Sequence, residues 1–340
     1  MRYAVSTVRL PSHISEIAMH YSLPLIALLA LIVSPAQAQD YPAKPVRIIA
    51  TFAQGGGADL TARILADRLT DAWKQQVIVE NRLGGGGTIG AEVVLRAPAD
   101  GYTLLLATNT HIISHVVYPK VSYDFMKDFA PIGLVASSPI LLAVHPGFKA
   151  NNLHELTDLL RASPGKYSYA SCNVASPQHF AMETYKHLLQ LVAVHIPHRG
   201  CTPAAIDAVA GHLEIVATSI PSGLPFVRQG KLRPIAVMSP KRSPSAPDIP
   251  TARESGIKEL ADFELEVYYG FMAPPGTPQA ILTKIERDAH AVLKSDDVAK
   301  KFAAAGLDVM QAGPVEMMRK INADHQKYAI AARAANIKPE

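Results

Sequence analysis

The sequence has little of the side-chain chemistry that marks several common classes of protein. Its 340 residues include one Trp, the aromatic share is only 6%, and no run of basic residues concentrates the formal charge of +4. Nucleic-acid binding is therefore disfavoured, because such surfaces combine clustered Lys and Arg with aromatic rings on which bases stack. After residue 38, no segment is apolar over the roughly 20 residues that a membrane-spanning helix needs.

Signatures of catalysis and of metal binding are also missing. The chain has no G-x-S-x-G motif, and Ser171 and Ser176 have no base–acid arrangement nearby beyond His179. Among the 13 histidines, His111 and His115 lack the Glu of an H-E-x-x-H motif, and no cysteine or carboxylate cluster accompanies them. We therefore expect neither an enzyme nor a metal or cofactor site.

The N-terminal segment has the pattern of a secretory signal peptide. Residues 22–33 read SLPLIALLALIV, an apolar run preceded by Arg2 and Arg9. Ala36 and Ala38 place small side chains at the two positions that a signal peptidase reads. We predict cleavage after Ala38 and export to the periplasm, with translation starting at Met1 or Met19. An uncleaved N-terminal anchor is the alternative.

Cysteine is scarce, and the two cysteines, Cys172 and Cys201, do not form a Cys-x-x-Cys pair. In an exported protein an even number of cysteines favours a disulfide. Such a bond would close a loop of about 30 residues and stabilise the chain by roughly 3–4 kcal/mol. Two buried free thiols, or two thiols too far apart to bond, are the alternatives.

Past the signal segment, short apolar runs alternate with amphipathic helical stretches. Removing 38 of the 340 residues leaves 302, which suits two domains. The predicted elements of the first part are strands at 46–52, 76–79 and 102–107 and helices at 59–69 and 88–95. This β-α-β-α-β order indicates a parallel sheet covered by helices. A similar pattern recurs from residue 140 to 238, a further strand is predicted at 268–273, and residues from 278 onward read as almost wholly helical.

The most informative local feature is the loop at residues 52–59, FAQGGGAD, between a predicted strand and a predicted helix. Glycines let the backbone turn sharply and expose its amides, and a helix N-terminus adds about half a positive charge. Such a loop can bind an anion without a cationic side chain, and Asp59 is placed to cap the helix. A capped turn without a ligand is the alternative.

Two further sites repeat this theme. Ser176 and Pro177 predict a helix start, with Ser as N-cap and Pro at the first helical position. Two such helix N-termini facing across a cleft would hold a carboxylate from both sides, and a purely structural cap is the alternative.

The glycines at 85, 87 and 90 match a dinucleotide fingerprint. However, no acidic residue follows about 20 positions later, where one would be needed to bind the ribose of a dinucleotide. We interpret this stretch as a second carboxylate-contacting or hinge-side loop, with a structural turn as the alternative.

Longer segments share one further pattern. They are residues 52–63 (FAQGGGADLTAR), 79–92 (VENRLGGGGTIGAE), 100–109 (DGYTLLLATN), 118–135, 164–171, 230–239 and 271–278 (FMAPPGTP). In sequence and order they resemble the Bug family, the solute-binding receptors of tripartite tricarboxylate transporters. The resemblance extends over essentially the whole chain after residue 38.

The resemblance implies a type II periplasmic binding protein fold, in which two α/β lobes joined by two crossovers surround a central cleft. Lobe 1 would comprise residues 39–137 and 263–340, and lobe 2 residues 138–262. The resemblance also suits a subgroup in which Cys172 tethers the cleft loop to Cys201. Carried over to this chain, the predicted ligand-binding residues are Phe52, Gly55, Gly56, Gly57, Asp59, Asn109, Ser138, Ser171, Asn173, Ser176, His179 and Thr218.

The chain departs from the family pattern at the expected cleft. Ala53 and Gln54 stand where prolines are usual, and Leu83 replaces a proline after Asn-Arg. Residues 173–175, Asn-Val-Ala, replace a Gly-Asn-Gly stretch, which restricts this loop. Thr218 stands where an Asp is common. These changes predict a specialised cleft and leave the identity of the ligand open.

We therefore expect a monomeric, extracytoplasmic receptor that closes by hinge motion around a small carboxylate-bearing organic acid. The resemblance implies delivery of this acid to the large and small permease subunits of a tripartite transporter. A periplasmic sensor that hands its liganded form to a membrane kinase is the alternative, and the sequence does not separate the two.

Overall fold

The computed structural model describes residues 41–118 and 120–337. The predicted signal peptide, with its cleavage site after Ala38, lies outside the described residues. Among the helices that the structure describes, none is long and apolar enough to cross a membrane.

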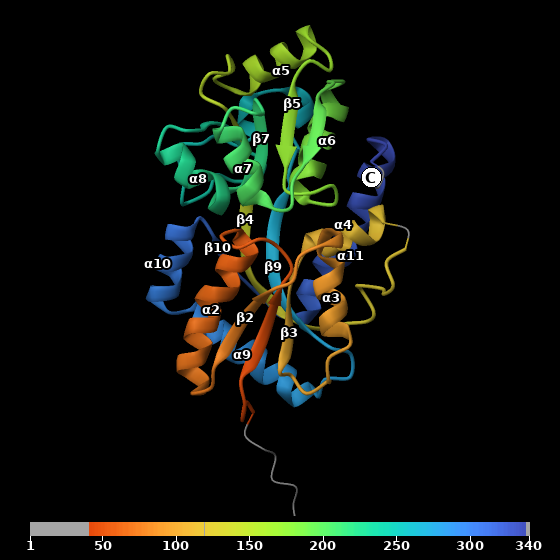
Figure 1. Ribbon diagram of the computed structural model, residues 1–340, viewed down its shortest axis with the longest axis vertical. Coiled ribbons are helices and arrows are strands. Elements are labelled where there is room, and N and C mark those ends of the chain that lie inside the picture. Colours follow the sequence, from red (N-terminus) through yellow and green to blue (C-terminus); the bar gives the residue numbers. More distant parts are fainter. Residues whose placement is uncertain (1–40, 119, 338–340) are drawn as a thin grey trace, which may run out of the picture. The chain divides into compact units, whose positions relative to one another are not determined.

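The strands form two groups, each covered by helices. The first strand group is built from the N-terminal and C-terminal parts of the described chain (Figure 1). Its strands are β1 (Val46–Ala50), β2 (Val77–Asn81), β3 (Thr103–Thr108), β9 (Glu266–Ala273), β10 (Asp308–Ala312) and residues 130–139 of β4 (Ala130–Val144). Its helices are α2 (Gly57–Trp73), α3 (Thr88–Leu95), α4 (Asn109–Val117), α9 (Gln279–Leu293), α10 (Asp296–Ala305) and α11 (Pro314–Ala334). The predicted parallel pairing of these three strands is present: β1 lies between β2 and β3 and is parallel to both.

The hydrophobic pattern explains the packing of this group. Leu65, Leu69 and Trp73 are buried and lie four residues apart, so they share one face of α2. All six residues of β3 are buried, which is typical of a central strand covered on both faces. The helix α2 contacts α9 and α10, and α11 packs against α4.

The second strand group follows β4 in the chain and has a core of its own. Its strands are residues 140–144 of β4, β5 (Ser168–Ser171), β6 (Val194–Pro197), β7 (Ile215–Ser219) and β8 (Arg233–Val237). Its helices are α5 (Leu153–Ala162), α6 (Pro177–Leu189), α7 (Cys201–Val209) and α8 (Ile220–Arg228). Leu141, Val216, Ile220 and Val237 are buried together at its centre.

The chain passes twice between the two groups, once within β4 and once in residues 238–265 between β8 and β9. Because β4 pairs with β9 at one end and with β7 and β8 at the other, a single strand connects the two cores. The predicted α/β architecture of two lobes with two crossovers is therefore confirmed. The residue boundaries of the lobes stay a prediction.

Three elements differ from the predictions. The C-terminal part is not almost wholly helical, because β10 pairs antiparallel with β4. The helix α8 was not predicted, since Gly223 and Pro225 within it both disfavour a helix. The helix α4 was missed as well, although Thr108 forms a capping box at its start. For β10 and α8, tertiary packing outweighs the local propensity.

Candidate ligand-binding site

A cavity of about 40 Å³ lies where loops of the two strand groups meet. From the first group it is lined by Phe52, Ala53, Gly56, Gly57, Ala58, Thr108, Thr110, Val267 and Tyr269. From the second group it is lined by Cys172, Asn173, Ser176, Gln178, Gly200, Cys201 and Ser219. None of these described lining residues carries a charged side chain.

Five helices begin at this cavity. Their N-cap residues are Gly56 for α2, Thr108 for α4, Ser176 for α6, Gly200 for α7 and Ser219 for α8, and each of these residues or its neighbour lines the cavity. The first N–H groups of a helix have no partner within the helix, and the helix dipole places partial positive charge there. The cavity is therefore electropositive although no Lys or Arg lines it, and it suits an anion.

The loop before α2 is held by a buried carboxylate. Asp59 is 2% exposed, and its carboxylate accepts hydrogen bonds from Gly55 N, Asn81 Nδ2 and Arg63 Nε at 3.0, 2.9 and 3.0 Å. Burial alone would raise the pKa of Asp59, but these hydrogen bonds outweigh it and lower the pKa. The same Asn81 amide donates to the Phe52 carbonyl at 3.0 Å, which fixes the start of the loop.

The predicted role of Asp59 as the helix cap needs a correction. Because α2 begins at Gly57, Gly56 is the N-cap and Asp59 is the third helical residue. Its side chain reaches back to the Gly55 amide instead of capping from the N-cap position. Asp59 does not line the cavity and shapes it through the loop.

A glycine is required at the start of α2. The hydroxyl oxygen of Tyr269 lies 2.1 Å from where a Cβ of residue 57 would be, so any larger residue would collide with this ring. Tyr269 lies on β9, and burial raises the pKa of its hydroxyl group. The first residue of α2 and the centre of β9 are thus brought into contact at the cavity.

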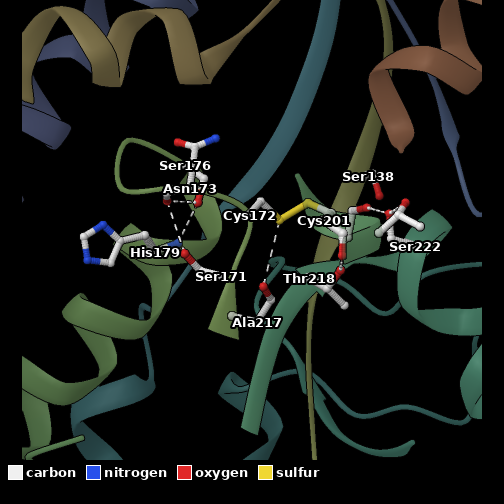
Figure 2. Close-up of a disulfide and its surroundings, with 12 residues drawn as sticks. Ser138, Ser171, Cys172, Asn173, Ser176, His179, Cys201, Ala217, Thr218 and Ser222 are labelled. Carbon is white, nitrogen blue, oxygen red and sulfur yellow. Dashed lines mark hydrogen bonds between the residues drawn. A yellow bond between two sulfur atoms is a disulfide. The ribbon is translucent and has the colours of Figure 1, made fainter. Parts of the chain in front are cut away.

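The loop between β5 and α6 forms the opposite wall (Figure 2). Ser176 is the N-cap of α6, as predicted: its Oγ accepts from His179 N at 3.1 Å and donates to the Asn173 carbonyl at 2.8 Å. The predicted disulfide between Cys172 and Cys201 is present and joins this loop to the first residue of α7. The alternative of two free thiols is therefore excluded.

Polar residues behind this wall support it. Ser171 Oγ lies 3.1 Å from the Asn173 carbonyl oxygen and 2.7 Å from His195 Nε2. The ring of His179 stacks on that of His195 with centroids 3.9 Å apart, and His179 Nδ1 bonds to the Val174 carbonyl. Burial and the nearby His179, Lys186 and His198 lower the pKa of His195 to about 3, and burial also lowers the pKa of His179. Both stacked rings are therefore neutral at physiological pH.

The structure divides the twelve predicted site residues into two sets. Those that line the cavity are Phe52, Gly56, Gly57, Asn173 and Ser176. The residues Gly55, Asp59, Asn109, Ser138, Ser171, His179 and Thr218 do not line it. Thr218 Oγ1, for example, donates to the Cys201 carbonyl at 3.2 Å, and Asn109 Nδ2 donates to Tyr328 Oη at 2.7 Å. Contact of any of the twelve with a ligand stays a prediction.

Several lining residues were not predicted from the sequence. Thr108 and Ser219 are N-caps of helices that local propensity conceals, and Thr110 lies in the first turn of α4. A Thr or Ser at the end of an apolar strand was the available signal for both caps. No local signal marks Tyr269, which reaches the cavity through strand pairing.

Comparison with known proteins places this chain in one family. The pattern of the tripartite tricarboxylate transporter family receptors matches residues 61–336. Protein BugT of Bordetella pertussis is 32% identical over 309 residues, which cover 90% of this chain and 94% of that protein. The structure of the periplasmic binding protein BugD superposes with a TM-score of 0.82 at 29% identity, covering 88% of this chain and 100% of that chain.

The structure of R. palustris Rpa4515 with adipate superposes with a TM-score of 0.84 at 29% identity, again covering 88% of this chain and 100% of the other. The BugD and Rpa4515 structures share the two-lobed α/β fold described above, and BugD is a periplasmic binding protein. The chain belongs to the tripartite tricarboxylate transporter receptor family, whose members are periplasmic solute-binding proteins and not enzymes.

Proposed function

We propose that this chain, after removal of its signal peptide behind Ala38, captures a small carboxylate-bearing organic acid in the periplasm. It then delivers the acid to the large and small permease subunits of a tripartite transporter. The observation that supports this proposal most is the convergence of five helix N-termini on a cavity without a charged lining side chain. Backbone amides and hydroxyl groups there match the oxygens of a carboxylate.

Chemical conversion of the acid has no support in this site. The nearest approach to a nucleophile–base pair is Ser171 with His195, at 2.7 Å. Ser171 is fully buried and does not line the cavity, so a bound acid has no access to its hydroxyl group. The proposal therefore assigns binding and release, and no chemical step, to this site.

The size of the cavity bears on how the acid enters. A volume of about 40 Å³ holds about three water molecules, at roughly 10–15 Å³ each. An organic acid needs more room to pass, and the lining residues come from both strand groups. We infer that the groups separate to admit the acid and then close on it.

Gly56→Val tests the carboxylate site, because Gly56 is the N-cap of α2 and lines the cavity. With protein purified from the periplasm, calorimetry against a panel of organic acids is expected to show binding that this substitution weakens at least about tenfold, a change of about 1.4 kcal/mol. The added methyl groups would occupy the space before the α2 amides.

Gly147→Val is the matched control. Gly147 is exposed and does not line the cavity, and its Cβ would have a clearance of 3.1 Å, similar to the 3.3 Å at Gly56. Equal affinity of wild type and Gly56→Val would remove the proposed site. Delivery is tested separately by uptake of the radiolabelled acid into cells with and without this gene. Unchanged uptake would contradict the delivery step even where binding stands.

A further inference from the structure

A second and larger cavity adjoins the first. Its volume is about 390 Å³, and Phe52 and Asn173 line both cavities. The other lining residues are Thr51, Leu83, Gly84, Gly85, Gly86, Gly87, His198 and Arg199. The shared residues make the two cavities neighbouring compartments of one cleft.

One wall of this second cavity is the glycine-rich loop that the sequence singled out. Gly84, Gly85, Gly86 and Gly87 all have positive φ, from 58° to 122°, a conformation that side chains other than glycine rarely adopt. A Cβ at Gly86 would lie 2.5 Å from Ser114 Oγ and 3.4 Å from the Cβ of Ala175 in the second strand group. The loop therefore presents bare backbone to the cavity and reaches across to the opposite wall.

The opposite wall carries one permanent charge. Arg199 is exposed, and the described residues offer its guanidinium no hydrogen bond or ion pair. The neighbouring His198 differs, because its Nε2 pairs with Asp207 at 3.0 Å. No acidic residue is among the described residues that line the cavity, so Arg199 lacks a counter-ion on its own wall.

The boundary between the compartments has an unsatisfied polar group. Asn173 Oδ1 is buried and has no hydrogen-bond partner among the described residues. In Figure 2 the Asn173 amide points away from the disulfide beneath it. A buried amide group without partners costs free energy unless a ligand or water supplies them. The unpaired atom is an acceptor at the boundary of the two compartments, where a water molecule or a donor group of a molecule that extends through both would supply its hydrogen bond.

We propose that the second cavity receives a second anionic group of the ligand and that Arg199 is its counter-ion. The bound acid would then be a dicarboxylate, with one carboxylate at the helix N-termini and the other at Arg199. This inference rests on the proposed function, because it assigns the class of acid for the same cleft. The glycine loop leaves room for the second group, and the guanidinium matches a carboxylate with two parallel hydrogen bonds.

Arg199→Gln tests this assignment with two ligands of equal length. Adipate and hexanoate both have six carbons, and only adipate has a second carboxylate. Calorimetry with dicarboxylates of four to eight carbons and the matching monocarboxylates first identifies the chain length that wild type prefers. For that length, Arg199→Gln is expected to weaken dicarboxylate binding about tenfold or more and to leave the monocarboxylate within about twofold. Arg199→Lys is expected to lose less, since it keeps the charge but not the paired hydrogen bonds.

Arg161→Gln on α5 is the control, because it removes the same charge from an exposed residue outside both cavities. It is expected to leave all affinities unchanged. The inference is overturned if wild type binds the dicarboxylate no more tightly than the matching monocarboxylate, or if Arg199→Gln weakens both equally; the proposed function survives either result. Failure of wild type to bind any carboxylate would remove the proposed function, and the inference with it.

Discussion

At the scale of single residues, the cavity depends on side chains that do not line it. The buried carboxylate of Asp59 accepts hydrogen bonds from Gly55, Arg63 and Asn81. These bonds fix the loop that carries Gly56 and its neighbours. A buried carboxylate is stable only when it is paired in this way. The orientation of the backbone amides that face the cavity therefore depends on Asp59, which does not line the cavity itself.

Asp59→Asn is expected to lower the free energy of unfolding by about 2–3 kcal/mol at pH 7, since it replaces charge-assisted hydrogen bonds by weaker ones. The pKa of Asp59 is lowered in the folded protein, so its contribution is complete above the unfolded value of about 3.9 and is lost as the pH falls through the folded value. Urea titrations should therefore give a constant difference between wild type and variant from pH 5 to 7, and a shrinking one below pH 4.

Asp67→Asn, on the exposed face of the same helix, is the control and should change stability by less than about 0.5 kcal/mol. A wild-type advantage over Asp59→Asn that grows as the pH falls below 4 would contradict the assigned sign.

At the scale of elements, the second wall of the cavity is a loop and a helix start held together by a covalent bond. Cys172 and Cys201 are 29 residues apart in sequence, and Gly200 N also donates to the Cys172 carbonyl at 2.8 Å. The bond joins the loop after β5 to the N-terminus of α7. Since both segments line the cavity, their relative position sets its width.

Reduction of the disulfide is expected to lower the free energy of unfolding by about 3–4 kcal/mol, the value for a closed loop of about 30 residues. It is also expected to weaken carboxylate binding, because the loop and α7 become free to separate. Urea unfolding and calorimetry with and without a reductant measure both effects. A variant with Cys172→Ser and Cys201→Ser should be insensitive to the reductant, and an equal response of that variant would show that the effect does not pass through this bond.

At the scale of the whole described chain, the two strand groups on either side of the cleft are joined by few connections. β4 belongs to both groups, residues 238–265 return the chain, and α11 contacts α4 in one group and α6 in the other. Few covalent connections and separate cores are the features of proteins that close by hinge motion. The small first cavity is consistent with a closed arrangement.

A saturating organic acid is expected to reduce the radius of gyration measured by small-angle X-ray scattering. At 100 times the Kd it should also raise the free energy of unfolding by about 2.7 kcal/mol, because the acid binds only the folded protein. At the same acid concentration Gly56→Val, with at least tenfold weaker binding, should gain at most about 1.4 kcal/mol. An unaltered radius of gyration in wild type at saturation would mean that the cleft does not close on its ligand.

The sequence by itself determined the local features of this protein. The order of the elements other than α4, α8 and β10, the N-cap at Ser176 and the glycine-rich turns follow from signals that act within one or two helical turns. Such signals can be recognised in the sequence alone. The chain-long resemblance added the family and the two-lobed fold. The disulfide was favoured by the cysteine count, and the structure confirms its pairing.

Only the tertiary structure decided which of these residues face the cavity. Gly57 meets Tyr269 and Asn109 meets Tyr328, contacts between residues more than 200 positions apart in sequence. Such contacts arise from strand pairing and helix packing, which also produce β10 and α8 against their local propensity. The same packing turns Asp59 and His179 away from the cavity and brings Arg199 to its second compartment, because burial and charge are settled by neighbours that the linear sequence does not show.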